Sequence, residues 1–195
     1  MCIDNNGQGR PVLHAFMQNE CALYIESCLQ FLEARYAAEQ TLTVFIDKDM
    51  AELIAIQAVF PLANIRLCSF HVASAVKRAL QRKGNMSAKQ IATYIEMFRG
   101  QRDSEIEEEY NSLRDQMAAV CPPDVVQYFE QQWWGCPRLW AAHCSDSPTF
   151  HVTTTNHAES FHQKIKRGLN NRTSLSAALA YLCETSTNLT TARTT

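Results

Sequence analysis

The chain has 195 residues and a mass of 22.1 kDa, a size that predicts one domain, or one domain with a large insertion. Apolar residues make up 46% of it and charged residues 19%, a balance typical of globular proteins and not of disordered tails. The 18 Lys and Arg against 20 Asp and Glu give a net charge of -2, which excludes a uniformly basic nucleic-acid binder but allows a local basic patch.

The sequence also argues against membrane and secreted proteins. No apolar run approaches the roughly 20 residues that a membrane-spanning helix needs. The N-terminus lacks the positive and apolar regions of a signal peptide. The eight cysteines form no Cys-x-x-Cys pair and are too sparse for a disulfide scaffold. We therefore expect reduced thiols in the cytosol or nucleus and no membrane partner.

The first 36 residues predict a hairpin followed by a helix. Residues 1–4 form a short apolar stretch that ends at Asp4, residues 5–7 (Asn-Asn-Gly) have turn chemistry, and residues 11–17 are strand-like. Apolar residues then recur at nearly helical spacing between positions 23 and 36, which predicts a helix.

The next stretch predicts alternating strands and helices. The run TLTVFI at residues 41–46 is continuous, apolar and β-branched, which is typical of a buried strand in a parallel sheet. A helix is expected over residues 50–59 with Asp49 as its N-cap. A second short strand is expected over residues 65–68 and a further helix over residues 72–81.

The region from about residue 87 to 142 is polar and helical, with no convincing strand, and it holds all three Trp residues. Aromatic packing is a more common role for these Trp side chains than stacking on bases. Between residues 77 and 103 there are seven basic and two acidic residues, and the acidic run DSEIEEEY begins at Asp103, the second of these. Solvated helix faces are the ordinary explanation for both runs. A closing helix over residues 158–182 completes an α/β fold of helices against a mixed sheet.

Asp47 is the first candidate functional residue. It follows the apolar strand directly, and ligands of open α/β sheets bind at the carboxyl ends of strands. A carboxylate at that position can hold Mg²⁺, which prefers a few oxygen ligands. The alternative is that Asp47 starts a turn or caps the next helix, although Asp49 fits the cap better.

Glu159 is the second candidate. Asn156 as N-cap with Glu159 three residues later makes a near capping box, and on periodicity alone this structural role is favoured. Glu159 also shares one polar helix face with His162, Gln163 and Lys166. A carboxylate at the top of a basic face could instead be a metal ligand beside phosphate-binding groups.

Cys68 and His71 are the third candidate. A Cys-x-x-His pair could be half of a zinc site, but its second half would have to come from Cys136, His143 and Cys144, whose spacing matches no standard finger. The pair could also be a nucleophile and its base, as in a cysteine hydrolase. The commonest alternative is a buried Cys beside a hydrogen-bonded His.

Taken together, these motifs resemble a known family. The stretch VFIDKDMAELIAIQAVFPLANIRLCSFHVASAVKR, followed far downstream by TTTNHAESFHQKIK, resembles the transposase core of Mutator-like (MULE) elements. It is most similar to the version in zinc-finger SWIM domain-containing proteins and in plant far-red-impaired-response factors. The segment NNGQGRPVLHAFMQNE resembles the strand pair that follows the first catalytic strand of that family.

The resemblance implies a ribonuclease-H-like fold with a DDE triad that holds Mg²⁺ or Mn²⁺ and supports two-metal phosphoryl transfer on DNA. Asp47 matches the second Asp of that triad, Glu159 matches the closing Glu, and Cys68 and His71 match the family's Cys-x-x-His. The implied organisation is a core at residues 1–86 without its first strand, a helical insertion at 87–145, a closing core segment at 146–183 and a frayed tail at 184–195.

The sequence departs from the family at the first Asp. That residue belongs to a strand upstream of the hairpin, and Asp4, at the hairpin turn, is no substitute for it. Two carboxylates leave two cations underneutralised, so we expect the isolated 195-residue chain to be unable to cut DNA. The SWIM zinc motif expected downstream in relatives is also absent from these residues.

The resemblance implies a nuclear, DNA-binding protein and allows a homo-oligomer. The alternative to a nuclease core is a domesticated regulatory module that binds DNA without catalysis. In both cases phosphate contacts are expected from two basic clusters. The first is the basic stretch over residues 77–102, whose candidate contacts are Lys77, Arg78, Arg82 and Lys83, and the second comprises Lys164, Lys166, Arg167 and Arg172.

Overall fold

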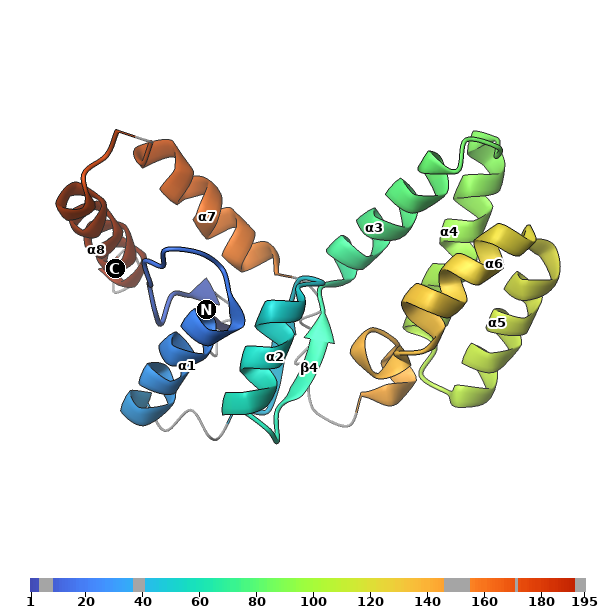
Figure 1. Ribbon diagram of the computed structural model, residues 1–195, viewed down its shortest axis with the longest axis horizontal. Helices are drawn as coiled ribbons and strands as arrows, with labels where there is room; N and C mark the ends of the chain where they lie inside the picture. Colours follow the sequence, from blue (N-terminus) through green and yellow to red (C-terminus); the bar gives the residue numbers. More distant parts are fainter. Residues whose placement is uncertain (4–8, 37–40, 146–154, 171, 192–195) are drawn as a thin grey trace. The chain divides into compact units, whose positions relative to one another are not determined.

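The computed structural model describes residues 1–3, 9–36, 41–145, 155–170 and 172–191 (Figure 1). It divides into two compact units. The first unit combines residues 1–20 with residues 155–195, and the second comprises residues 21–154. None of the described helices is both long and apolar enough to cross a membrane.

The first unit contains the predicted hairpin in a shorter form. Strand β1 (Cys2–Ile3) pairs antiparallel with β2 (Gly9–Arg10), with Cys2 opposite Arg10. The prediction of a strand over residues 11–17 is wrong, since β2 ends at Arg10 and these residues form no strand. Pro11 has no backbone N–H to donate to a strand ladder, which explains why β2 ends there. The expected turn residues 5–7, and Asp4 before them, lie outside the described residues.

The closing helix predicted over residues 158–182 is divided into two. Helix α7 (Asn156–Gly168) ends where Leu169 adopts an extended conformation, and α8 (Leu175–Thr191) begins after a turn. The backbone N–H of Arg172 donates to the Asn170 side chain within this turn, which is ordinary turn chemistry for Asn. The ring of Tyr181 on α8 lies against Gly168 at the end of α7, where a Cβ would lie only 2.1 Å from it, so any larger residue there would displace the ring.

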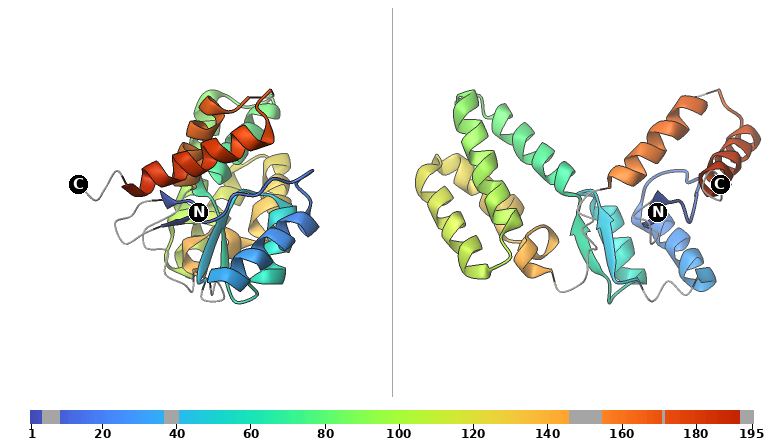
Figure 2. Two further views of the ribbon diagram at one scale, coloured as in Figure 1. Left: turned by 90° about the vertical axis from the view of Figure 1, so that its left-hand side faces the viewer. Right: turned by 180° about the vertical axis from the view of Figure 1, so that it is seen from behind.

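The second unit contains the parallel strand pair that the sequence predicts. Strand β3 (Thr43–Ile46) lies beside β4 (Asn64–Leu67) (Figure 2). The register runs from Thr43 opposite Asn64 to Ile46 opposite Leu67. Helix α2 (Met50–Val59) connects the strands and packs against α1 (Ala22–Tyr36). Helix α3 (Ser69–Arg82) follows β4 and buries Val72, Val76 and Leu80.

The predicted helical region contains helices joined by short turns and, within its described length, no strand. It consists of α4 (Ala88–Asp103), α5 (Glu107–Val120), α6 (Pro123–Phe129), a π-helix η2 (Glu130–Trp134) and the short 3₁₀ helices η3 (Pro137–Leu139) and η4 (Ala142–Cys144). We call residues 88–144 the helical block. Ser87 and Gln90 form a capping box at its start, which satisfies donors of the first turn of α4.

Aromatic side chains form the core of the helical block. The Phe98 ring stacks on Trp140 with centroids 4.5 Å apart, and it also contacts Phe129 and Trp133. Trp133 and Trp140 are buried, at 1% and 3% exposure. These two rings therefore pack inside the protein and do not offer a surface for stacking on bases.

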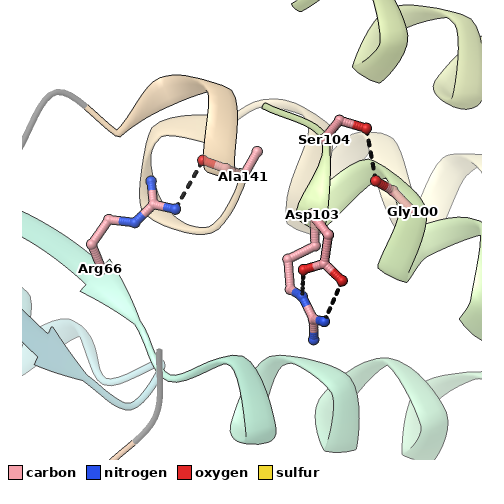
Figure 3. Close-up of polar contacts among 6 residues, drawn as sticks. Arg66, Gly100, Asp103, Ser104 and Ala141 are labelled. Atoms are coloured by element: carbon pink, nitrogen blue, oxygen red, sulfur yellow. Dashed lines mark hydrogen bonds and ion pairs between the residues drawn. The ribbon is translucent and has the colours of Figure 1, made fainter. Parts of the chain in front are cut away.

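A buried arginine joins the strand pair to the helical block. Arg66 on β4 donates from Nη2 to the carbonyl oxygen of Ala141 at 2.8 Å (Figure 3). It also donates from Nη1 to the carbonyl oxygen of Arg138 at 2.9 Å. The backbone N–H of His143 then donates to the carbonyl oxygen of Ser104, between α4 and α5. Two carbonyl groups thus replace the water that this guanidinium loses on burial.

Candidate metal centre

The carboxyl end of β3 places Asp47 at the edge of the parallel pair. Asp49 accepts hydrogen bonds from the backbone N–H groups of Ala51 and Glu52 and is the N-cap of α2, as predicted. The capping role is therefore filled by Asp49, and the Asp47 side chain points elsewhere. That side chain is 53% exposed.

Cys68 and His71 lie at the carboxyl end of the neighbouring strand. The backbone N–H of Cys68 donates to the carbonyl oxygen of Ile46 at 2.8 Å, which continues the pairing of β3 and β4 by one residue. Cys68 is the N-cap residue of α3 and is fully buried, whereas His71, on the first turn of α3, keeps 30% of its side chain exposed. Both residues therefore share one edge of the sheet with Asp47.

The three side chains converge. His71 Nδ1 lies 2.6 Å from Asp47 Oδ1, and the ligand atoms of Asp47, Cys68 and His71 all lie within 4.8 Å of one another. Among the described residues, this is the one group of three or more His, Cys, Asp or Glu side chains close enough to hold a metal ion. It offers one oxygen, one sulfur and one nitrogen donor.

The proposed second half of a zinc site does not join this group. Cys144 Sγ lies 3.2 Å from His143 Nε2, and Cys136 Sγ lies 3.6 Å from the carbonyl oxygen of Gln132. Burial raises the pKa of the Cys136 thiol, which the charge of nearby Lys48 partly offsets. Cys136 thus has a structural environment within the helical block.

Burial also bears on the interpretation of Cys68 as a nucleophile. The side chain is 0% exposed, so an external substrate has no access to its sulfur. Reactive cysteines lie in at least partly exposed positions. The geometry is therefore that of a buried thiol or a metal ligand, and it does not favour a hydrolase.

Glu159 lies in the other unit, on the first turns of α7. The N-cap of this helix is Thr155, so the predicted capping box with Asn156 as N-cap is wrong. The hydroxyl of Thr155 donates to Glu159 Oε1 at 3.1 Å, and the carboxylate is half-buried. Residues 151–154, which contain the start of the family motif, lie outside the described residues. The pairing of Glu159 with Asp47 stays a prediction.

The basic candidates differ in their surroundings. Lys77, Arg78 and Arg82 are exposed on α3, and Lys164, Lys166 and Arg167 are exposed on α7. Lys83 differs, because its ammonium donates to the backbone oxygen of Asp124 at 2.7 Å and to Oδ2 of the same residue at 2.9 Å. The hydrogen bond from the Lys83 ammonium to the Asp124 carboxylate is the main cause that lowers the pKa of Asp124. The Lys83 ammonium is therefore already paired within the protein.

Residues 1–75 match the family model of the MULE transposase domain. The match supports a MULE transposase core in this part of the chain, as the sequence resemblance predicted. It includes β3, β4 and the whole Asp47–Cys68–His71 group, whereas Glu159 and the helical block lie beyond the matched segment. No curated protein and no solved structure matches the chain.

One feature of the strand edge that carries Asp47 has no signal in the sequence. Lys48, directly after Asp47, donates from Nζ to the backbone oxygen and to Oε1 of Gln132, both at 3.1 Å. The same ammonium lies 4.1 Å from the ring centroid of Trp133, within cation–π range. Burial lowers the pKa of Lys48. The loop that carries Asp47 is thus held against the π-helix of the helical block.

Proposed function

We propose that the chain is a transposase-derived DNA-binding module with a ribonuclease-H-like core, whose ancestral chemistry is metal-dependent cleavage and transfer of DNA strands. One observation carries the proposal. Asp47 and His71 meet at the carboxyl ends of two parallel strands, inside the segment that matches the MULE transposase domain. Polar ligand groups at this position are typical of α/β proteins that bind phosphate-containing ligands.

Mg²⁺ or Mn²⁺ fits the carboxylates of the proposed site. Asp47 offers an exposed oxygen at the strand end, and Glu159 offers a second, half-buried carboxylate on α7. Mg²⁺ keeps several of its waters and needs only one or two carboxylates from the protein. When bound, such an ion activates a nucleophilic oxygen and stabilises the leaving oxygen of a phosphodiester. Asp47 and Glu159 would hold it, because both side chains offer the oxygen donors that Mg²⁺ prefers.

The DNA phosphates would contact α3 and α7. The apolar side of α3 is buried, so Lys77, Arg78 and Arg82 extend from its exposed side. On α7 the exposed Lys164, Lys166 and Arg167 follow Glu159 toward the end of the helix. Each phosphate contact adds affinity without sequence preference, and this affinity falls as salt rises.

Metal binding is tested by thermal unfolding of the 195-residue chain with and without Mg²⁺ or Mn²⁺. A cation that binds only the folded state raises the Tm, and we expect the increase to be lost in Asp47→Asn and in Glu159→Gln. Asp49→Asn is the matched control, since Asn caps a helix as well as Asp does. An unchanged increase in Glu159→Gln would contradict the shared metal site.

DNA binding is tested by fluorescence anisotropy on a labelled duplex across a series of salt concentrations. Lys77→Glu with Arg78→Glu should weaken binding and reduce the salt slope by about 0.9 for each phosphate that the protein no longer neutralises. Arg35→Glu on α1 is the control, because it removes an exposed cation outside both basic clusters. Binding that is insensitive to salt would contradict the phosphate contacts.

Nicking of supercoiled plasmid distinguishes the two versions of the proposal. The 195 residues bring two of the three carboxylates that the resemblance implies, so we expect the isolated chain to bind DNA without nicking it. This outcome fits a nuclear regulatory module that has kept the fold. Metal-dependent nicking that Asp47→Asn abolishes would instead establish strand cleavage by these residues alone.

A further inference from the structure

We propose that Asp47, Cys68 and His71 form a binding site for a borderline-soft divalent cation of the Zn²⁺ class, which competes with Mg²⁺ for the Asp47 carboxylate. The site itself uses neither Glu159 nor DNA. The competition, but not the zinc binding, rests on the magnesium role of Asp47 proposed above.

The donor set favours zinc over magnesium. Mg²⁺ prefers oxygen ligands, whereas sulfur and imidazole nitrogen select Zn²⁺ and related transition metals. Cys68 and His71 supply these two donors, and Asp47 supplies an oxygen that zinc also accepts. Three protein ligands with a fourth position open to water are a recurrent zinc arrangement.

The distances are short enough for one ion. Zinc bonds of about 2.0 Å to nitrogen or oxygen and about 2.3 Å to sulfur place tetrahedral ligand atoms within about 4 Å of one another. The three ligand atoms here already lie within 4.8 Å, and His71 Nδ1 and Asp47 Oδ1 lie 2.6 Å apart. A metal would separate this last pair slightly and draw the sulfur inward, which small side-chain rotations can accomplish.

The backbone fixes two of the three ligands before any metal arrives. Cys68 is held by its hydrogen bond to Ile46, and His71 is held by the first turn of α3. Asp47 is 53% exposed, so an ion would meet this ligand first, and the buried Cys68 sulfur would join it through the side-chain rotations described above. Binding requires that the Cys68 thiol loses its proton, which passes to solvent, so affinity rises with pH.

Occupancy by zinc has a consequence for the proposed magnesium site. A carboxylate oxygen engaged by Zn²⁺ is no longer available to Mg²⁺ at the same position. The family-matched edge would therefore discriminate between two metals, with Cys68 and His71 adding affinity for the softer ion alone. Zinc would inhibit any magnesium-dependent function of Asp47.

The test is a Co²⁺ titration of the reduced 195-residue chain, followed by competition with Zn²⁺. Co²⁺ bound through a thiolate gives a sulfur-to-cobalt charge-transfer absorption, which we expect in the wild type and not in Cys68→Ser. Asp47→Asn and His71→Gln should each weaken Zn²⁺ binding by roughly tenfold or more, since even outer-shell substitutions cost 10–100-fold. Cys121→Ser is the matched control for loss of a buried thiol, and Asp49→Asn for loss of a nearby carboxylate.

The outcomes separate this proposal from the previous one. A charge-transfer band that survives Cys68→Ser would assign the metal to another cysteine and overturn the site, as would unchanged zinc affinity in Asp47→Asn. If Cys68→Ser fails to fold by circular dichroism, His71→Gln and Asp47→Asn carry the test, because both side chains lie nearer the solvent. Zinc binding without any magnesium-dependent Tm increase would overturn the competition and the magnesium site but leave the zinc site standing.

Discussion

The strand edge and the helical block of the second unit differ in how their polar groups are exposed to solvent. At the edge, Asp47, Cys68 and His71 bring donor atoms together, with one carboxylate largely open to solvent. In the helical block, large rings are removed from water, and the indole N–H groups of the two buried Trp side chains are paired internally. Trp133 Nε1 donates to the Tyr128 hydroxyl at 2.9 Å, and Trp140 Nε1 donates to the carbonyl oxygen of Trp133 at 3.0 Å.

This contrast indicates where stability and chemistry reside. Burial of an aromatic ring with its N–H satisfied contributes several kcal/mol to folding. A half-exposed pair of charged groups contributes little, because solvent screens it. Substitutions in the helical block should therefore change the free energy of unfolding, whereas substitutions at the edge should change ligand binding at nearly constant stability.

The largest effect is expected at the centre of the aromatic core. Trp133→Ala removes a ring that is 1% exposed and should lower the free energy of unfolding by about 3–5 kcal/mol. Leu62→Ala is the control, because Leu62 is 92% exposed and should change stability by less than about 0.5 kcal/mol. Urea unfolding followed by circular dichroism measures both. A loss below about 1 kcal/mol for Trp133→Ala would mean that the block is not the main source of stability.

The second-largest loss of stability is expected at Arg66, which links the strand edge to the helical block. Arg66→Met leaves the carbonyl groups of Arg138 and Ala141 without the guanidinium, and we expect a loss of about 2–4 kcal/mol. Arg99→Met is the matched control, since Arg99 pairs with Glu96 on the exposed face of α4 and such pairs contribute about 0.5 kcal/mol or less. Equal losses in the two variants would show that the buried contacts of Arg66 do not join the edge to the block.

Alkaline pH offers a third comparison, through Tyr110 in the block. Burial raises the pKa of Tyr110 to about 12, while an exposed tyrosine titrates near pKa 10. The folded pKa is the higher one, so the stabilisation is complete below pH 10 and is lost as pH rises toward 12. We expect a loss of about 2 kcal/mol across this range, reduced in Tyr110→Phe. Burial also raises the pKa of Cys121, to about 11. This thiol adds to the fall of the free energy of unfolding with pH in the wild type, and the same contribution remains in Tyr110→Phe. A slope that is identical in both proteins would contradict the assignment to Tyr110.

Local signals in the sequence predicted much of the fold. The apolar run before Asp47 and the capping chemistry of Asp49 predicted β3 and α2, and both are confirmed. Where two local signals competed, prediction was less accurate. The apolar periodicity of residues 158–182 concealed the turn around Asn170, and a candidate cap at Asn156 concealed the true N-cap at Thr155.

The sequence identified the residues of the candidate site but not the contacts that bring them together. Asp47 follows one predicted strand and Cys68 ends the next, and parallel pairing of those strands would have placed them at one edge. The 2.6 Å approach of His71 to Asp47 depends on how α3 leaves β4, which no local pattern encodes. The contact of Lys48 with Gln132 and Trp133 joins segments far apart in the sequence, and only the packing of the helical block determines it.

The smallest expected change in stability, and the sharpest test of the contrast, is at Asp47. Without metal, Asp47→Asn should alter the free energy of unfolding by less than about 0.5 kcal/mol, because the carboxylate is 53% exposed and solvent screens its contact with His71. Urea unfolding in the presence of a chelator measures this value, with Asp49→Asn as the neighbouring control. A loss above about 1 kcal/mol would make Asp47 a structural residue of the β3–α2 loop. A near-zero change together with lost metal binding would assign its carboxylate to the ligand, since only a group that folding does not require can be removed at so little cost.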